Sequence, residues 1–280
     1  MREIAYDTIV SAVAALCVEA ATVLPDDLCR SLIAAQKRER SPVGAAILSD
    51  VAENFTFAAA RGLPICQDTG MAVVFAELGQ EVHIVGGLLA DGVNAGVAQG
   101  YVAGHLRCSV VADPLRRVNT NDNTPAILHL TLVPGDRLTL TLAPKGFGSE
   151  NMTGLKMFTP SATQEDVEDY VVSCVRAAGS NPCPPVLVGV GLGGTSEQAA
   201  LLAKKALLRP VDGENEDPYY ADMERRLLRR INALGVGPQG LGGDTTALSV
   251  AVLPHPTHIA GLPCCVNLGC HVTRHAQVVL

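Results

Sequence analysis

A short loop between a predicted helix and a predicted strand, residues 63–70, constrains this chain more than any other stretch. Its sequence is Leu-Pro-Ile-Cys-Gln-Asp-Thr-Gly, in which Pro64 breaks the helix and Gly70 permits a tight turn. Three consecutive loop residues carry a thiol, an amide and a carboxylate: Cys66, Gln67 and Asp68. Such a loop suits a site that needs a metal ligand, a hydrogen-bonding group and a proton carrier close together. A plain turn with a buried free cysteine is the alternative interpretation.

The composition supports a large core and argues against nucleic-acid binding. The chain has 280 residues, enough for one large domain or two small ones, and 48% of them are apolar. Because Trp is absent and Phe and Tyr are few, the core must be built from Ala, Val and Leu. The net charge of −7 argues against a nucleic-acid-binding surface. Any site for an anion must therefore be made locally.

The N-terminus and the cysteine count favour a cytoplasmic protein. The most apolar N-terminal run, residues 9–18, is about half of the roughly 20 residues that a membrane span needs. Glu3 and Asp7 precede it, where a signal peptide would be basic. The nine cysteines have no disulfide-framework spacing, and the cytosol keeps thiols reduced. We expect no membrane span and a cytoplasmic location.

Hydrophobic periodicity predicts a mixed α/β fold with a helical N-terminus. The predicted helices cover residues 3–21, 26–38, 42–60, 88–102, 161–178, 195–209 and 217–234. The predicted strands cover residues 72–78, 82–85, 127–133, 137–143, 186–190 and 246–253. Leu and Thr alternate on both sides of the turn at 134–136, which predicts a β-hairpin. Ser161 and Gln164 form a predicted capping box. We expect a single large domain over residues 1–280, with room for two subdomains.

Three of the nine cysteines stand in loops that Pro or Gly shape: Cys66, Cys183 and Cys270. Three others lie inside helical patterns and are expected to be packing residues: Cys17, Cys29 and Cys174. The remaining three fit either class: Cys108, Cys264 and Cys265. Loop cysteines far apart in sequence can converge in space, and thiolates are the usual ligands of iron–sulfur clusters. Zinc is the competing interpretation, but the paired Cys-x₂-Cys spacing of structural zinc sites is missing.

A glycine-rich stretch at 189–194, Gly-Val-Gly-Leu-Gly-Gly, matches the dinucleotide-binding fingerprint after a predicted strand. The acidic residue of that fingerprint should end a second parallel strand. Asp212 has nearly the right spacing, but a predicted helix precedes it. We therefore discount a nucleotide-binding oxidoreductase. The stretch could still offer backbone N–H groups to an anion, or it could be a plain strand-to-helix turn.

Titratable residues flank Cys270, and arginines gather in the polar connection at 104–126. His258 precedes Cys270 by twelve residues. The residues after Cys270 include His271, Arg274 and His275. The arginines of the connection are Arg107, Arg116 and Arg117. In an acidic protein such a group suits carboxylate recognition, because the guanidinium fork matches a carboxylate. A solvated loop is the alternative.

Five segments together resemble the class I, iron–sulfur-dependent fumarate hydratases. They read PICQDTG, LRCSVVADPLRRVNTNDNTPA, APKGFGSENM, NPCPPVLVGVGLGGT and PTHIAGLPCCVNLGCHVTRHA, and they cover nearly the whole chain in order. The likeness is to the alpha subunit of the two-subunit form, which is equivalent to the N-terminal half of the single-chain form. Single segments are not specific, but their combination is.

The resemblance implies a 4Fe–4S cluster and a set of roles for residues of this chain. The cluster would be held by three thiolates, those of Cys66, Cys183 and Cys270. The fourth iron would bind substrate as a Lewis acid. The implied catalytic residues are Asp68 and His258. The implied substrate-binding residues are Gln67, Arg107, Gly146 and Gly148.

The resemblance also implies a partner and a reaction. A beta subunit would complete the active site, in an α₂β₂ heterotetramer, and the substrate would be a small dicarboxylate. The polar connection looks closest to fumarases, so hydration of fumarate to (S)-malate is the expected reaction. Tartrate dehydratase and mesaconate hydratase share the architecture and stay as alternatives. An electron-transfer iron–sulfur protein is the alternative from another class, but it usually has a fourth cysteine ligand and no use for Asp68 or His258.

Overall fold

The computed structural model describes all 280 residues and divides into two compact units. Unit 1 comprises residues 1–25, 55–147 and 274–280, and unit 2 comprises residues 26–54 and 148–273. The fold is mixed α/β with a helical N-terminus, as the sequence predicts. The boundary between the units falls within two helices along the chain, α3 (Pro42–Arg61) and α5 (Phe147–Glu150).

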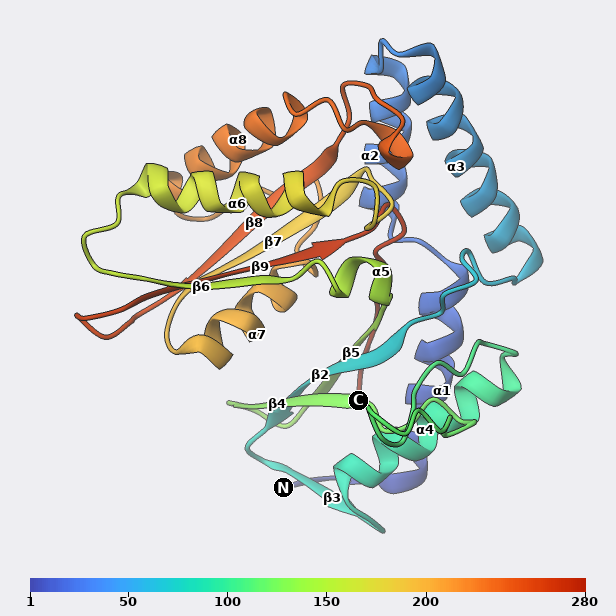
Figure 1. Cartoon of the computed structure of the whole chain (residues 1–280). Helices are drawn as coiled ribbons and strands as arrows, with labels where there is room; N and C mark the ends of the chain where they lie inside the picture. Colours follow the sequence, from blue (N-terminus) through green and yellow to red (C-terminus); the bar gives the residue numbers. More distant parts are fainter. The chain divides into compact units, whose positions relative to one another are not determined.

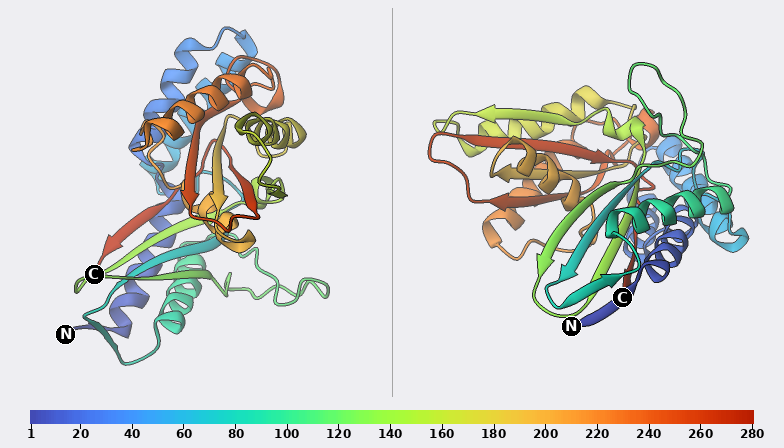
Figure 2. Two further views of the ribbon diagram at one scale, coloured as in Figure 1. Left: turned by 90° about the vertical axis from the view of Figure 1, so that its left-hand side faces the viewer. Right: turned by 90° about the horizontal axis from the view of Figure 1, so that it is seen from below.

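Unit 1 is a four-stranded mixed sheet covered on one face by two helices. The strands run in the order β10 (Ala276–Val279), β5 (Leu138–Lys145), β2 (Met71–Gly79) and β4 (Ile127–Val133). The helices α1 (Tyr6–Thr22) and α4 (Leu89–Ala103) pack side by side against this sheet (Figures 1 and 2). A separate parallel pair joins β1 (Arg2–Ala5) to β3 (Val82–Val85). Alternate residues of β2 and β5 face the helices and form the core of this unit.

The predicted hairpin over residues 127–143 is wrong. Both of its strands form, but β2 lies between them and pairs with β4 in parallel and with β5 in antiparallel orientation. The connecting turn crosses the end of β2, where the Gly79 N–H donates to the carbonyl of Arg137 at 2.8 Å. The alternation marked the buried face of β5, where Leu138, Leu140 and Leu142 are fully buried, but Leu130 and Leu132 of β4 are exposed. The alternation carried no information on which strand each would pair with.

Unit 2 is a sheet with helices on both faces. Its strands run in the order β6 (Gly154–Phe158), β9 (Leu262–Gly269), β7 (Val186–Gly193) and β8 (Ala247–His255). One face carries α6 (Gln164–Ala178) and α8 (Pro218–Asn232), and the other carries α7 (Ser196–Ala206) (Figure 1). The unit also contains α2 (Asp26–Arg38) and a 3₁₀ turn, η1 (Pro238–Gly240). The central strand β7 is buried along its whole length.

The glycines of the fingerprint-like stretch serve packing inside β7. A Cβ atom at Gly189 would collide with the carbonyl oxygen of Ala203, and one at Gly191 with that of Ala199. Both carbonyls belong to α7, so the glycines let this helix approach the strand closely. The alternate residues of the strand, Val186, Val188 and Val190, face α6 and α8. This arrangement agrees with discounting a nucleotide site.

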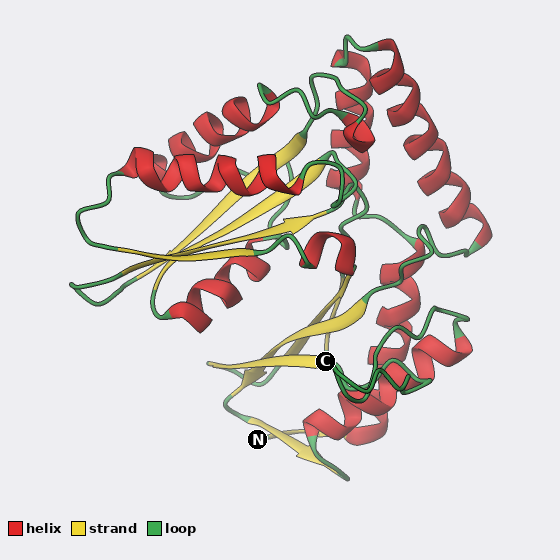
Figure 3. Ribbon diagram, in the orientation of Figure 1, coloured by secondary structure: helices red, strands yellow, loops and turns green.

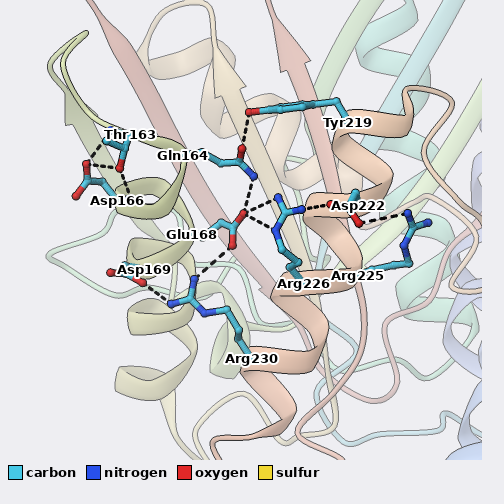
Figure 4. Close-up of polar contacts among 10 residues, drawn as sticks. All are labelled: Thr163, Gln164, Asp166, Glu168, Asp169, Tyr219, Asp222, Arg225, Arg226 and Arg230. Carbon is cyan, nitrogen blue, oxygen red and sulfur yellow. Dashed lines mark hydrogen bonds and ion pairs between the residues drawn. The ribbon is translucent and has the colours of Figure 1, made fainter.

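The helices α6 and α8 are joined by an ion-pair network around Glu168 (Figure 4). Its side chain is almost fully buried and accepts hydrogen bonds from Gln164, Arg226 and Arg230. Burial opposes ionisation of Glu168, but the hydrogen bonds from Arg226 and Gln164 outweigh it and lower the pKa of this carboxyl. The capping box of α6 is Thr163 with Asp166, two residues later than predicted. The network therefore fixes how the two helices pack on the sheet.

The first two helices meet the length and composition of a membrane span only when they are joined. Within residues 6–38, the most apolar 18-residue window has a mean hydropathy of 1.8, and 44% of that window is buried. The chain leaves helical geometry at 23–25, so α1 has 17 residues and α2 has 13. Each is shorter than the roughly 20 residues of a span. The apolar side of α1 packs in the core of unit 1.

We expect Gly191→Ala to destabilise the protein by about 1–3 kcal/mol, because the added methyl group would push α7 away from β7. Gly261→Ala is the matched control, since a Cβ atom there meets nothing within 4 Å. Urea unfolding of both variants measures the difference. Equal midpoints for the two variants would contradict this account of the packing.

Candidate functional site

The loop that carries Cys66 is held rigidly within unit 1. It runs from the end of α3 to β2 without regular structure (Figure 3). Thr69 is buried, and the hydroxyl of Tyr101 donates to the carbonyls of Thr69 and Gly70 at 2.8 and 3.1 Å. Gly70 has a φ of +74°, and a Cβ atom there would lie 2.8 Å from the backbone nitrogen of Lys145. Only glycine fits this turn, as the sequence predicts.

Asp68 and Gly146 lie close together in unit 1. One carboxylate oxygen of Asp68 accepts from the N–H of Gly70 at 3.0 Å, and the other accepts from the N–H of Phe147 at 3.1 Å. A Cβ atom at Gly146 would lie 3.1 Å from this second oxygen. The carboxylate is therefore fixed in orientation by two backbone donors. A carboxylate held in this way can serve as a proton carrier at a defined position.

Gln67 and Arg107 complete the predicted group in unit 1. The Cys66 thiol lies 3.5 Å from the amide oxygen of Gln67. The backbone carbonyl of Arg107 accepts from the hydroxyl of Thr69 at 3.1 Å, and its side chain is exposed. Arg107 thus joins the Cys66 loop through its backbone, and the amide of Gln67 and the guanidinium of Arg107 are both groups that can bind a carboxylate.

Two residues that the sequence did not assign to the site also hold this loop. Arg274 is 4% exposed, and its Nη2 donates to the carbonyl of Asp68 at 2.8 Å. Asn123 is fully buried and joins the backbone N–H of Ser109 to the carbonyl of Gly70. A buried guanidinium requires such partners, because its desolvation is costly. The polar, turn-rich character of the 104–126 connection was the signal that could have drawn attention to Asn123.

Cys183 and Cys270 lie at one end of the unit 2 sheet. The strands β7 and β9 are antiparallel, with Leu187 opposite Gly269. Cys183 stands three residues before β7 and Cys270 directly follows β9, so both lie at the same end of the sheet. The backbone N–H of His271 donates to the carbonyl of Cys183 at 3.3 Å, and its ring Nδ1 lies 2.9 Å from the same oxygen. Two cysteines far apart in the sequence are thereby brought to one edge.

His258 lies at the opposite end of that sheet from Cys270, so their closeness in sequence does not place them together. It follows β8, which ends at His255 opposite Gly193, and it precedes β9. Most of the residues between His258 and Cys270 belong to β9, which runs across the sheet. The ring Nδ1 of His258 accepts from the N–H of Ala260 at 3.1 Å. Gly148 lies in unit 2, beside the carbonyl of Asn181. The proposed catalytic role of His258 stays a prediction.

Burial raises the pKa of the other six cysteine thiols, which disfavours the thiolate form. Burial raises the pKa of Cys17 and Cys264 to about 12 and that of Cys265 to about 11. It also raises the pKa of three others: Cys29, Cys108 and Cys174. A metal ligand must be a thiolate. Cys183 is exposed, and Cys66 and Cys270 are half-buried, as are Cys29, Cys108 and Cys174.

Comparison with known proteins identifies the family. A family model described as fumarate hydratase (Fumerase) matches residues 10–279. The chain belongs to this family of hydro-lyases. It is 37% identical over 264 residues to the "Putative L(+)-tartrate dehydratase subunit alpha" of Methanocaldococcus jannaschii, covering 92% of each chain. It is 30% identical over 263 residues to the L(+)-tartrate dehydratase subunit alpha of Escherichia coli (strain K12), covering 92% of this chain and 86% of that protein.

We expect iodoacetamide to label Cys66, Cys183 and Cys270 in the native apoprotein and to spare Cys17 and Cys264. Raising the pH from about 7 to about 9 should not recruit the two buried thiols, since their pKa of about 12 leaves them protonated. Peptide mass spectrometry reports each site. Labelling of Cys17 or Cys264 at rates like those of the loop cysteines would contradict the assignment.

Proposed function

We propose that this chain is the alpha subunit of a two-subunit 4Fe–4S hydro-lyase whose substrate is L(+)-tartrate. The observation that carries the substrate is the naming of its relatives, which are alpha subunits of L(+)-tartrate dehydratases aligned over 92% of this chain. The resemblance in the polar connection had favoured fumarate. Fumarate stays as the second candidate, because the matching family model is described as fumarate hydratase.

The proposed cluster ligands are Cys66, Cys183 and Cys270. All three stand in loops and none is fully buried, and Cys183 and Cys270 already share one edge of unit 2. No group of three or more His, Cys, Asp or Glu side chains is preassembled for a metal in the structure. We propose that the third ligand comes from the Cys66 loop of unit 1. When bound, the cluster would supply an open iron that acts as a Lewis acid on the leaving hydroxyl group.

The residues of the Cys66 loop would do the remaining chemistry. Dehydration of tartrate removes a proton from one carbon and hydroxide from the next, and the resulting enol becomes a keto acid. The Asp68 carboxylate is the proposed acceptor of that carbon-bound proton, because the N–H groups of Gly70 and Phe147 fix its orientation. Gln67 and the exposed guanidinium of Arg107 would bind the substrate carboxylates.

We propose a beta subunit as partner, because both relatives are named as alpha subunits. It would supply the rest of the substrate-binding groups, and a heterotetramer in the cytoplasm is the proposed assembly. His258 would take part in proton transfer if the assembly places it at a site. An electron-transfer protein is less well supported, since such a protein has no use for the backbone-held carboxylate of Asp68.

Serine at Cys66, Cys183 or Cys270 should abolish binding of about four iron atoms per chain after anaerobic reconstitution. Serine at Cys17 or Cys174 should leave the iron and sulfide contents unchanged, because both thiols are packing residues. Iron and sulfide assays on the five variants test the ligand assignment. Full iron in all five would refute it.

The reconstituted pair of subunits should give a higher kcat/KM for L(+)-tartrate than for fumarate or mesaconate, and the isolated alpha chain should show little turnover with any of them. Steady-state assays of each substrate decide this. A higher kcat/KM for fumarate would keep the family and replace the substrate. Full activity of the isolated chain would remove the need for a partner.

Asp68→Asn should lower turnover of the loaded enzyme by about 10²–10⁴, since a positioned general base is worth that much. The amide keeps the shape and can still accept one of the two backbone hydrogen bonds. Iron content, measured in parallel, should match the wild type. A wild-type rate with a full cluster would assign proton transfer to another residue.

A further inference from the structure

Gln239 stands on a glycine-rich loop beside the Cys183 and Cys270 end of unit 2. It lies within η1 and adopts a left-handed conformation with a φ of +53°. Its backbone N–H donates to the carbonyl of Pro184 at 2.8 Å, and its side-chain Nε2 donates to the same oxygen at 3.0 Å. The residue next to Cys183 is thus held by Gln239 through two bonds.

The same side chain reaches the residue next to Cys270. The Nε2 of Gln239 lies 3.1 Å from the Nδ1 of His271, and this ring nitrogen lies 2.9 Å from the carbonyl of Cys183. Gln239 therefore contacts the neighbours of both cysteines at once. The link from the amide to the two cysteines runs through the carbonyl of Pro184 and the imidazole of His271.

Cys183 needs such support because its backbone is strained. Its φ is +54°, in the left-handed region that residues with a side chain rarely adopt. Non-glycine residues persist in this region only where the surroundings hold them, and they gather at functional sites. Here the carbonyl of Cys183 is held by His271, and the next carbonyl, that of Pro184, is held by Gln239.

The loop that presents Gln239 is itself fixed at both ends. A Cβ atom at Gly240 would collide with the side chain of Ser180, so the loop packs directly against the segment before Cys183. At its other end, the buried carboxylate of Glu39 accepts from the N–H groups of Asp244 and Thr245 at 2.9–3.0 Å. Gln239, Pro184 and His271, which we call the clamp, are therefore held in place by the packing of unit 2.

We propose that Gln239 is a positioning residue for the cluster ligands Cys183 and Cys270, acting through Pro184 and His271. The inference rests on the proposed cluster and adds to it the group that fixes the geometry of two of its ligands. Residues that orient metal ligands from behind typically alter metal affinity by about 10–100-fold when they are replaced. Loss of the Gln239 amide should therefore lower the affinity of the site for iron, although the three cysteine ligands are still present.

The test compares Gln239→Leu with wild type and with Gln80→Leu, a change at an exposed glutamine outside this clamp. Each protein is reconstituted anaerobically, and release of iron to a chelator is followed. Gln239→Leu should lose iron roughly 10-fold faster or more, with a shifted EPR spectrum of the reduced cluster, and Gln80→Leu should match wild type. The melting temperature of each apoprotein is measured in parallel.

Unchanged iron release and an unchanged EPR spectrum in Gln239→Leu would overturn the proposal. A lower melting temperature of the apoprotein with an unchanged EPR spectrum would also overturn it, because it would show a merely structural role. If Gln239→Leu does not fold, the same measurements are made on His271→Ala, which removes the ring and keeps the backbone hydrogen bond to Cys183. This variant should also release iron faster, and wild-type iron release would overturn the proposal. Failure of the wild type to bind iron and sulfide would instead refute the cluster itself.

Discussion

The antiparallel pairing of β7 with β9 is the constraint on which the candidate site in unit 2 depends. With Leu187 opposite Gly269, the chain must bring Cys183 and Cys270 to the same end of the sheet. The glycines of β7 allow α7 to pack closely on one face, and its valines bury the other face under α6 and α8. The sheet is therefore rigid where the two thiols emerge. The same pairing sends His258 to the far end.

In unit 1, hydrogen bonds from distant residues, and not strand pairing, hold the loop that carries Cys66. Its loop from Cys66 to Gly70 has no regular structure, so its backbone groups are satisfied by residues from distant segments. Tyr101 and Asn123 donate to its carbonyls, Arg274 donates to the carbonyl of Asp68, and the N–H of Phe147 binds the Asp68 carboxylate. A loop fixed in this way presents a thiol and a carboxylate in defined positions. Such preorganisation is what a catalytic group requires.

Local features of the sequence predicted much of this structure, and long-range contacts account for what it missed. The helix predicted over residues 26–38 has the observed bounds, because a proline and charged residues mark its ends. The hairpin prediction failed, since alternation does not reveal that β2 would insert between two strands. The bond from Arg274 to Asp68 joins residues 206 apart, and no spacing rule could predict it. The selection of Cys66, Cys183 and Cys270 as ligands stays a prediction, because burial alone does not separate them from the half-buried Cys29, Cys108 and Cys174.

The central claim is that Cys66, Cys183 and Cys270 bind one 4Fe–4S cluster. The most direct measurement is a crystal structure of the anaerobically prepared alpha and beta subunits, with anomalous diffraction collected at the iron absorption edge. The account predicts one compact iron peak per alpha chain, bonded to these three sulfur atoms, with one iron lacking a cysteine ligand. Iron bound to any other cysteine, or no iron in a complex that turns over its substrate, would contradict it.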